Sequence, residues 1–88
     1  MKPVLFQEES NAQYREWAKT NKKTFKKIVE LIKDIQRDSF NGIGKPEPLK
    51  HQYKGFWSRR ITLEHRLIYQ ISPQNEIIII SCKGHYSN

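Results

Sequence analysis

The sequence has one cysteine, few acidic residues and no long apolar segment. Cys82 is the single cysteine among the 88 residues, so no disulfide can form within the chain, and a lone thiol fits the reducing cytoplasm. The longest apolar run, at residues 77–80, is far too short to span a membrane. No apolar stretch with a small-residue cleavage site opens the chain, so no secretory signal is expected. We therefore predict a cytoplasmic protein that does not insert into a membrane.

The motifs of several enzyme classes are also missing. The sequence contains no Gly-rich phosphate loop and no Cys/His spacing typical of a zinc site. Its histidines are scattered, and its carboxylates are too sparse for a two-metal nuclease centre. Any catalysis is therefore expected to proceed without a metal and without another cofactor.

What the chain does have is positive charge. Sixteen Lys and Arg residues stand against nine Asp and Glu, which gives a formal net charge of +7. A small chain this basic should attract a polyanion: nucleic acid is the first candidate, an acidic protein the second and an anionic membrane surface the third. With 36% hydrophobic residues the chain can still build one small core, so we predict a single domain over residues 1–88.

The N-terminal half has the pattern of a short strand followed by two helices. Residues 2–6 form the expected strand. Ser10 with Gln13 resembles a capping box for the first helix, and the two glutamates at residues 8–9 are an alternative start. The pair at residues 20–21 interrupts the pattern and can cap the second helix.

Apolar residues at helical spacing make the second helix the clearest element. The stripe consists of Phe25, Ile28, Val29, Ile32 and Ile35, with Leu31 beside it. Most lysines of this segment lie off the stripe. These lysines could form a solvated helix face, or they could form a surface that contacts RNA or a partner protein. The pattern fits both interpretations equally well.

Strand patterns follow a break at residues 38–48, where two glycines and two prolines exclude a helix. Alternation then places Leu67, Tyr69 and Ile71 on one strand face and Arg66 on the other. Turns are expected at residues 62–65 and 72–75, and residues 77–82 lack alternation, as in a central strand covered on both faces. We predict an α+β fold: two N-terminal helices on one face of a small twisted, mainly antiparallel sheet, with Arg66 on the open face.

Lysine, arginine and histidine residues are interleaved with aromatic residues over residues 45–66. Lysine and arginine can hold phosphates while aromatic rings stack on unpaired bases. The candidate RNA-binding residues are Lys50, His51, Lys54, Arg59 and Arg60. Adjacent strand residues face opposite ways, so at most one of Arg59 and Arg60 points into a given face.

Three further residues suit metal-free RNA cleavage. A base must take the proton of the 2′-hydroxyl, an acid must protonate the leaving 5′-oxygen, and a cation must balance the charge of the transition state. Glu47, His85 and Arg66 are candidates for these roles. From spacing alone, however, an ion pair is the favoured reading of Glu47, with a general base as the alternative, and His85 alone would be an exposed tail residue.

Four motifs occur in a fixed order along the chain. They are GKPEPLKH at residues 44–51, GFWSRRIT at 55–62, EHRLIY at 64–69 and the terminal pair His85-Tyr86. Together with the helical LIKD at 31–34, these motifs resemble the YoeB/Txe toxins of the RelE superfamily. The resemblance covers nearly the whole chain.

The resemblance implies a RelE-like fold and a ribosome-dependent endoribonuclease, which cuts mRNA in the ribosomal A site and stops translation. Matched position by position, Glu47 corresponds to the family's general base, Arg66 to its transition-state arginine and His85 to its general acid. Tyr86 matches the tyrosine that shapes the same site. Residues that match the lining of the RNA pocket are Lys50, His51 and Arg60.

The resemblance also implies partners. These are mRNA, the ribosome with its rRNA, and a YefM/Axe-type antitoxin whose C-terminal segment wraps the toxin, with operator DNA reached only through that antitoxin. Homodimers are common among such toxins, and no membrane partner is implied. The rival readings are a catalytically weak module that binds RNA or the ribosome and a structural partner of the antitoxin.

The chain departs from the family pattern near its end. Ser87 and Asn88 extend beyond Tyr86, which commonly ends these chains, and Gly84 replaces an aromatic residue often found before the histidine. A glycine there is expected to loosen the backbone that aims His85.

Overall fold

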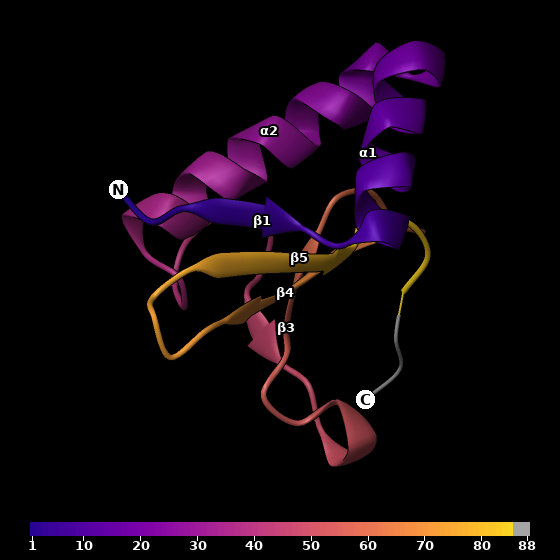
Figure 1. Cartoon of the computed structure of the whole chain (residues 1–88). Helices are drawn as coiled ribbons and strands as arrows, with labels where there is room; N and C mark the ends of the chain where they lie inside the picture. Colours follow the sequence, from indigo (N-terminus) through magenta and orange to yellow (C-terminus); the bar gives the residue numbers. More distant parts are fainter. Residues whose placement is uncertain (86–88) are drawn as a thin grey trace.

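The computed structural model describes residues 1–85 as two helices and a five-stranded sheet. The elements in chain order are β1 (Val4–Phe6), α1 (Glu8–Thr20), α2 (Lys22–Arg37), β2 (Glu47–Pro48), the 3₁₀ turn η1 (His51–Tyr53), β3 (Trp57–Arg60), β4 (Arg66–Ile71) and β5 (Ile77–Ser81). The strand order is β1-β5-β4-β3-β2, with β1 parallel to β5 and every other pair antiparallel. Both helices cover one side of the sheet, and the connection that carries η1 extends away on the other (Figure 1).

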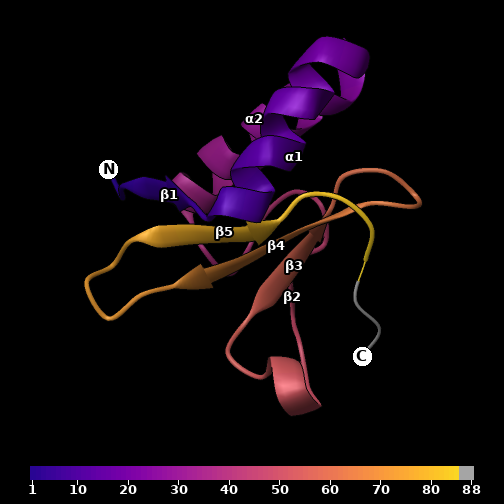
Figure 2. The ribbon, with the colours of Figure 1, turned by 45° about the vertical axis from the view of Figure 1, so that its right-hand side comes forward.

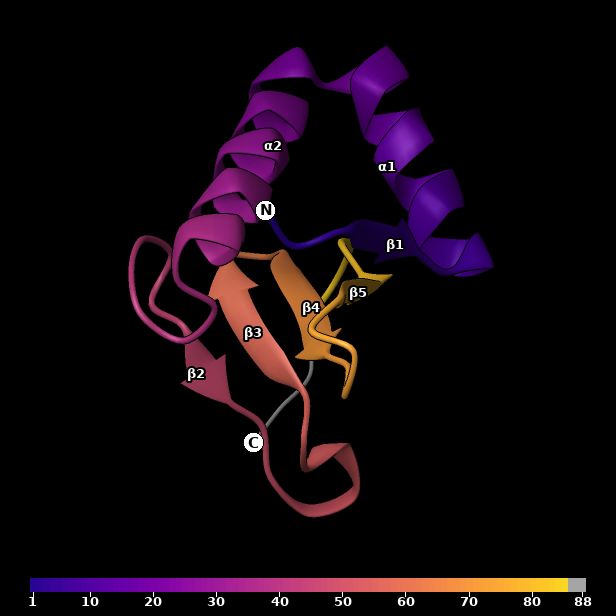
Figure 3. The same cartoon turned by 60° about the vertical axis from the view of Figure 1, so that its left-hand side comes forward.

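The two helices form a hairpin whose turn lies far from the sheet (Figure 3). Helix α1 begins at Glu8, where two glutamates in the first turn favour the positive end of the helix dipole. The capping-box prediction for Ser10 was therefore wrong. Its buried hydroxyl donates instead to the carbonyl of Ile79 at 2.7 Å and so ties α1 to β5. Asn21 caps α2 as predicted, because its side-chain oxygen accepts from the Thr24 N–H at 3.1 Å.

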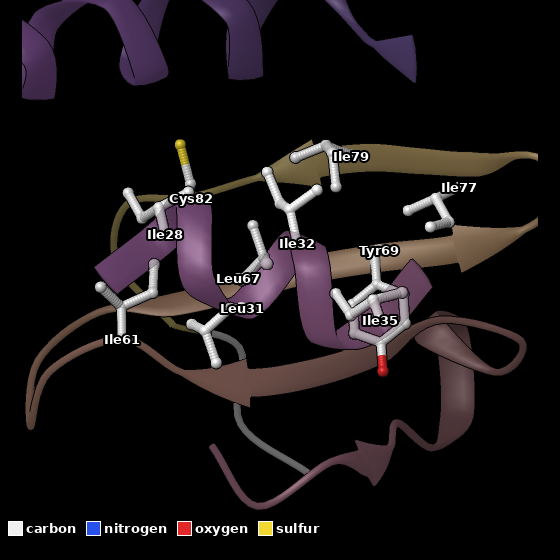
Figure 4. Packing of buried hydrophobic residues seen from close by; sticks show 10 residues of the cluster. All are labelled: Ile28, Leu31, Ile32, Ile35, Ile61, Leu67, Tyr69, Ile77, Ile79 and Cys82. Atoms are coloured by element: carbon white, nitrogen blue, oxygen red, sulfur yellow. The ribbon is translucent and has the colours of Figure 1, made fainter. Parts of the chain in front are cut away.

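The core lies between α2 and the helix-facing side of the sheet (Figure 4). Leu67 and Tyr69 are buried there, as the alternation predicted, and Ile71 is half-buried at the margin. Leu31 is completely buried and belongs to the centre of the helical stripe rather than to its side. Neither helix of residues 1–85 is long and apolar enough to cross a lipid bilayer.

Strand β5 lies between β1 and β4, but its two faces are not equally covered. Ile77 and Ile79 are fully buried, whereas Ile78 and Ile80 are half-buried, because the helices cover only one side of the sheet. The prediction of a strand buried on both faces was thus only partly right. The opposite face has its own buried residues, since Ile68 is 1% exposed and Leu49 is 5% exposed.

A buried arginine organises the connection between α2 and β2. The side chain of Arg59 is fully buried and pairs with the carboxylate of Asp34 at 2.6 Å. Its other terminal nitrogen donates to the carbonyl of Asp38 at 2.7 Å, and its Nε donates to the Tyr69 hydroxyl at 3.2 Å. Because this side chain lies on the helix side of the sheet with no exposed surface, the prediction that Arg59 binds RNA was wrong.

Candidate active site

Strand pairing brings several of the predicted site residues to the sheet face opposite the helices. Glu47 is paired with Ser58 across β2 and β3, and Arg60 is paired with Arg66 across β3 and β4. Directly paired residues present their side chains on the same face, and residues two apart in one strand do so as well. Glu47, Ser58, Arg60 and Arg66 therefore share one face, as predicted for Arg66.

A pocket of about 170 Å³ opens on this face. It is lined by Lys45, Glu47, Leu49, Ser58, Arg60, Arg66 and His85. The pocket thus brings together a carboxylate from β2, an arginine from β4 and an imidazole from the C-terminal segment. Three cations around one carboxylate suit both readings of Glu47, charge balance in the resting protein and proton acceptance during a reaction.

The hairpin loop between β3 and β4 orients Arg66. Its Nη1 donates to the carbonyls of Thr62 at 2.8 Å and of Leu63 and His65 at 3.2 Å each. Within residues 1–85 all side-chain hydrogen bonds of Arg66 use this one nitrogen. Its Nε and Nη2 are therefore available to an anion that enters the pocket.

The backbone on either side of Glu47 is fixed by hydrogen bonds to β3 and to Phe56, the residue before it. The N–H of Arg60 donates to the carbonyl of Gly44 at 2.6 Å, and the N–H of Leu49 donates to the carbonyl of Phe56 at 2.9 Å. Gly44 adopts φ +78°, and a Cβ there would come within 2.7 Å of the Leu31 side chain. The sharp entry into β2 therefore requires glycine at this position.

Three of the other four predicted RNA-binding residues lie outside the pocket. Lys50, His51 and Lys54 are exposed on the connection around η1, which projects beyond the sheet (Figure 2). Arg60 is exposed and lines the pocket. Tyr86 and the Ser87-Asn88 extension lie outside the residues that the structure describes.

Two polar pocket residues, and the apolar Leu49, were absent from the predicted site. Lys45 belongs to the same cationic stretch of sequence, and Ser58 shares strand parity with Arg60, so both signals were present. Neither residue type is distinctive enough to be selected without the strand pairing. No group of three or more His, Cys, Asp or Glu side chains within residues 1–85 could hold a metal ion.

Comparison with known proteins places the chain among bacterial toxins. Residues 6–86 match the family model described as the YoeB-like toxin of bacterial type II toxin-antitoxin systems. The toxin YoeB of Escherichia coli strain K12 is 52% identical over 83 residues, which cover 94% of this chain and 98% of that protein.

Solved structures agree with this match. A YoeB dimer from Staphylococcus aureus superposes with a TM-score of 0.89 at 44% identity, covering 97% of this chain and 98% of that one. A YoeB-YefM complex from the same organism gives a TM-score of 0.88 at 45% identity, covering 98% and 99%. The complex RelBE2 from Mycobacterium tuberculosis, at 21% identity, gives 0.71 over 96% and 98%, which confirms the predicted RelE-like fold.

Proposed function

Because the chain belongs to the YoeB-like toxins of bacterial type II toxin-antitoxin systems, we propose that it is a ribosome-dependent endoribonuclease. It cuts mRNA in the ribosomal A site, in the cytoplasm, and thereby stops translation. The observation that supports this proposal most directly is that Glu47, Arg66 and His85 line the same pocket. These are the base, cation and acid that cleavage by the RNA's own 2′-hydroxyl requires.

In the proposed reaction Glu47 takes the proton of the 2′-hydroxyl as that oxygen attacks the adjacent phosphorus. The bond from phosphorus to the 5′-oxygen breaks, and protonated His85 donates its proton to the leaving oxygen. Arg66 balances the negative charge that develops on the phosphoryl oxygens, since a guanidinium is permanently cationic and can bind two oxygens at once. The products are a 2′,3′-cyclic phosphate and a 5′-hydroxyl.

The remaining residues are proposed to bind the RNA. Lys45 and Arg60 would hold phosphates at the pocket, while Lys50, His51 and Lys54 extend the basic surface along the η1 connection. The resemblance assigns Tyr86 to the same site, and we propose that it acts there.

Programmed ribosomes with a defined mRNA test the roles of the three residues. Glu47→Gln, Arg66→Ala and His85→Ala should each lower the cleavage rate by about a hundred- to ten-thousand-fold, the usual contribution of positioned acid–base groups. Glu16→Gln is the matched control for Glu47→Gln, because it removes one exposed carboxylate charge on α1, and this residue does not line the pocket. Wild-type cleavage by a folded Arg66→Ala protein would remove that residue from the mechanism.

The substrate itself tests the nucleophile. A single 2′-deoxy substitution at the scissile nucleotide should abolish cutting without abolishing ribosome binding. If the deoxy substrate is cut at the same bond, water is the nucleophile, and the roles given to Glu47 and His85 fail.

We also propose that a YefM-type antitoxin neutralises this chain and that the chain forms homodimers. Support comes from its similarity to the S. aureus protein, whose structures include a YoeB-YefM complex and a YoeB dimer. The first proposal predicts that the product of the neighbouring gene binds this chain in an affinity measurement. The second predicts that the purified chain sediments as a dimer.

A further inference from the structure

The segment that leads from β5 to His85 is bonded along its backbone to α1. The indole N–H of Trp17 donates to the carbonyl of Cys82 at 2.9 Å. The N–H of Cys82 donates to the side-chain oxygen of Gln13 at 2.7 Å. Helix α1 therefore fixes the point at which the chain leaves the sheet.

Two consecutive residues, His65 and Arg66, hold Gly84, which lies two positions after Cys82. Its N–H donates to Nδ1 of His65 at 2.9 Å, and its carbonyl accepts from the backbone N–H of Arg66 at 2.7 Å. Gly84 adopts φ +73°, a conformation that glycine tolerates best, and an added Cβ would meet nothing within 4 Å. Glycine therefore serves the backbone conformation here, and its expected looseness is offset by bonds to both of its polar groups.

The His65 ring is itself held in place. It packs edge-on against Trp17, with ring centroids 5.0 Å apart at 70°. Its backbone N–H donates to the Thr62 hydroxyl at 3.1 Å, and its carbonyl accepts from the backbone of Ile61 at 3.0 Å. An imidazole nitrogen accepts a hydrogen bond only when it carries no proton, so the bond to Gly84 requires neutral His65 with its proton on Nε2.

We propose that His65 is a positioning residue that aims His85 at the pocket through its hydrogen bond to Gly84. This inference rests on the proposed function for its catalytic consequence, because His85 acts as the acid there. Two consecutive residues, His65 and Arg66, would thus determine the positions of both the guanidinium and the imidazole of the site. A variant without the His65 acceptor loses the bond to Gly84, so His85 is no longer held in place, while the residues that bind RNA are unchanged. We therefore expect kcat to fall and KM to change little.

Two variants of His65 separate this role from simple packing. His65→Asn places an acceptor oxygen at the same number of bonds from the backbone as Nδ1, whereas His65→Leu keeps the bulk and removes the acceptor. Both variants lose the ring contact with Trp17. We expect His65→Leu to lower kcat on programmed ribosomes by at least about tenfold and His65→Asn to retain most of it. Equal losses in both variants would mean that His65 acts by packing alone and would overturn the inference.

A measurement on the wild-type chain makes the test independent of cleavage. In ¹⁵N-labelled protein, the Gly84 amide should show a scalar coupling to Nδ1 of His65 and slow hydrogen exchange, which His65→Leu abolishes. A fast-exchanging Gly84 amide in the wild type, or a His65→Leu protein with wild-type kcat, would overturn the inference. A wild type that shows the coupling but does not cut mRNA supports the His65–Gly84 contact and refutes the proposed function instead.

Discussion

Arg59 and Arg60 are neighbours in β3, yet their side chains lie in opposite environments. Arg60 is exposed at the pocket, while Arg59 is buried against Asp34 and the carbonyls of the α2–β2 connection. A buried guanidinium is tolerated only when its charge and its N–H groups find partners, and Arg59 has both. A basic sequence motif can therefore combine a binding residue with a structural one.

Replacing each arginine should separate these two roles. Arg59→Met leaves the Asp34 carboxylate without its buried partner and should lower the free energy of unfolding by about 3–5 kcal/mol. Arg60→Ala removes an exposed side chain and should change stability by no more than about 0.5 kcal/mol while it weakens RNA cleavage. Urea unfolding of both variants gives the comparison. Equal unfolding midpoints for Arg59→Met and the wild type would show that the buried pair is energetically neutral.

Asp34 makes stability depend on acid pH. Hydrogen bonds from Arg37, from the Ile43 N–H and from Arg59 hold the pKa of the Asp34 carboxyl well below its usual value. A lowered folded-state pKa stabilises the fold above the unfolded pKa of about 3.9, and this contribution is lost as the pH falls below that value.

We therefore expect the thermal unfolding temperature of the wild type to drop steeply below about pH 4. Asp34→Asn should be less stable at neutral pH and should show a shallower acid dependence. If both proteins follow the same pH profile, Asp34 is not the group responsible.

At the scale of elements, sequence periodicity and capping residues predicted the helices and hairpins that depend on neighbouring residues. The helical stripe of α2, the cap at Asn21 and the antiparallel hairpin of β3 and β4 all occur as expected. The parallel pairing of β1 with β5 was not predicted, because it joins strands from opposite ends of the chain. The burial of Leu31 also depends on the sheet that covers it, which helical spacing alone does not reveal.

The candidate site shows the same limit. That Glu47 lies opposite Ser58, and so on the face of Arg66, depends on the register of a strand only two residues long. Nothing in the local sequence sets that register, and the motifs shared with a known family suggested the grouping instead. The reach of His85 to the pocket likewise depends on tertiary contacts of Gly84.

Two glycines, one on each side of β2, test how the connections into and out of this strand are built. Gly44 and Gly55 both have positive φ, but a Cβ on Gly44 would approach the Leu31 side chain at 2.7 Å, whereas one on Gly55 would meet nothing within 4 Å. Gly55→Ala should cost only the backbone strain, roughly 1–2 kcal/mol. Gly44→Ala should cost more, because overpacking adds about 1–3 kcal/mol. Chemical denaturation measures both, and equal costs would mean that Leu31 yields freely.

At the scale of the whole molecule, the net charge of +7 should govern the rate of association with an acidic partner. For the proposed antitoxin, the association rate constant should fall by roughly tenfold or more when salt rises from about 0.05 to about 0.5 M, with little change in dissociation. Reversing the charge of Lys26, which is exposed on α2, also tests whether that lysine face is a contact surface or merely solvated. A rate constant that does not respond to salt would contradict electrostatic steering.

Cys82 should report on opening of the whole core. Its side chain is fully buried in the cluster between α2 and the sheet, and its thiol lies 3.8 Å from the carbonyl of Ser10 in α1. Burial raises the pKa of the Cys82 thiol to about 12, so the reactive thiolate is scarce at neutral pH even before access is considered.

A disulfide reagent should therefore label the native chain very slowly, at a rate set by unfolding. In urea, labelling should accelerate over the same concentrations at which tryptophan fluorescence reports unfolding, because exposing this sulfur requires α1, α2 and β5 to separate. The Arg59→Met protein, if destabilised as expected, should label faster than the wild type in buffer alone. Rapid labelling of the wild type well below its unfolding transition would show instead that α1 opens by itself and that the core is not one cooperative unit.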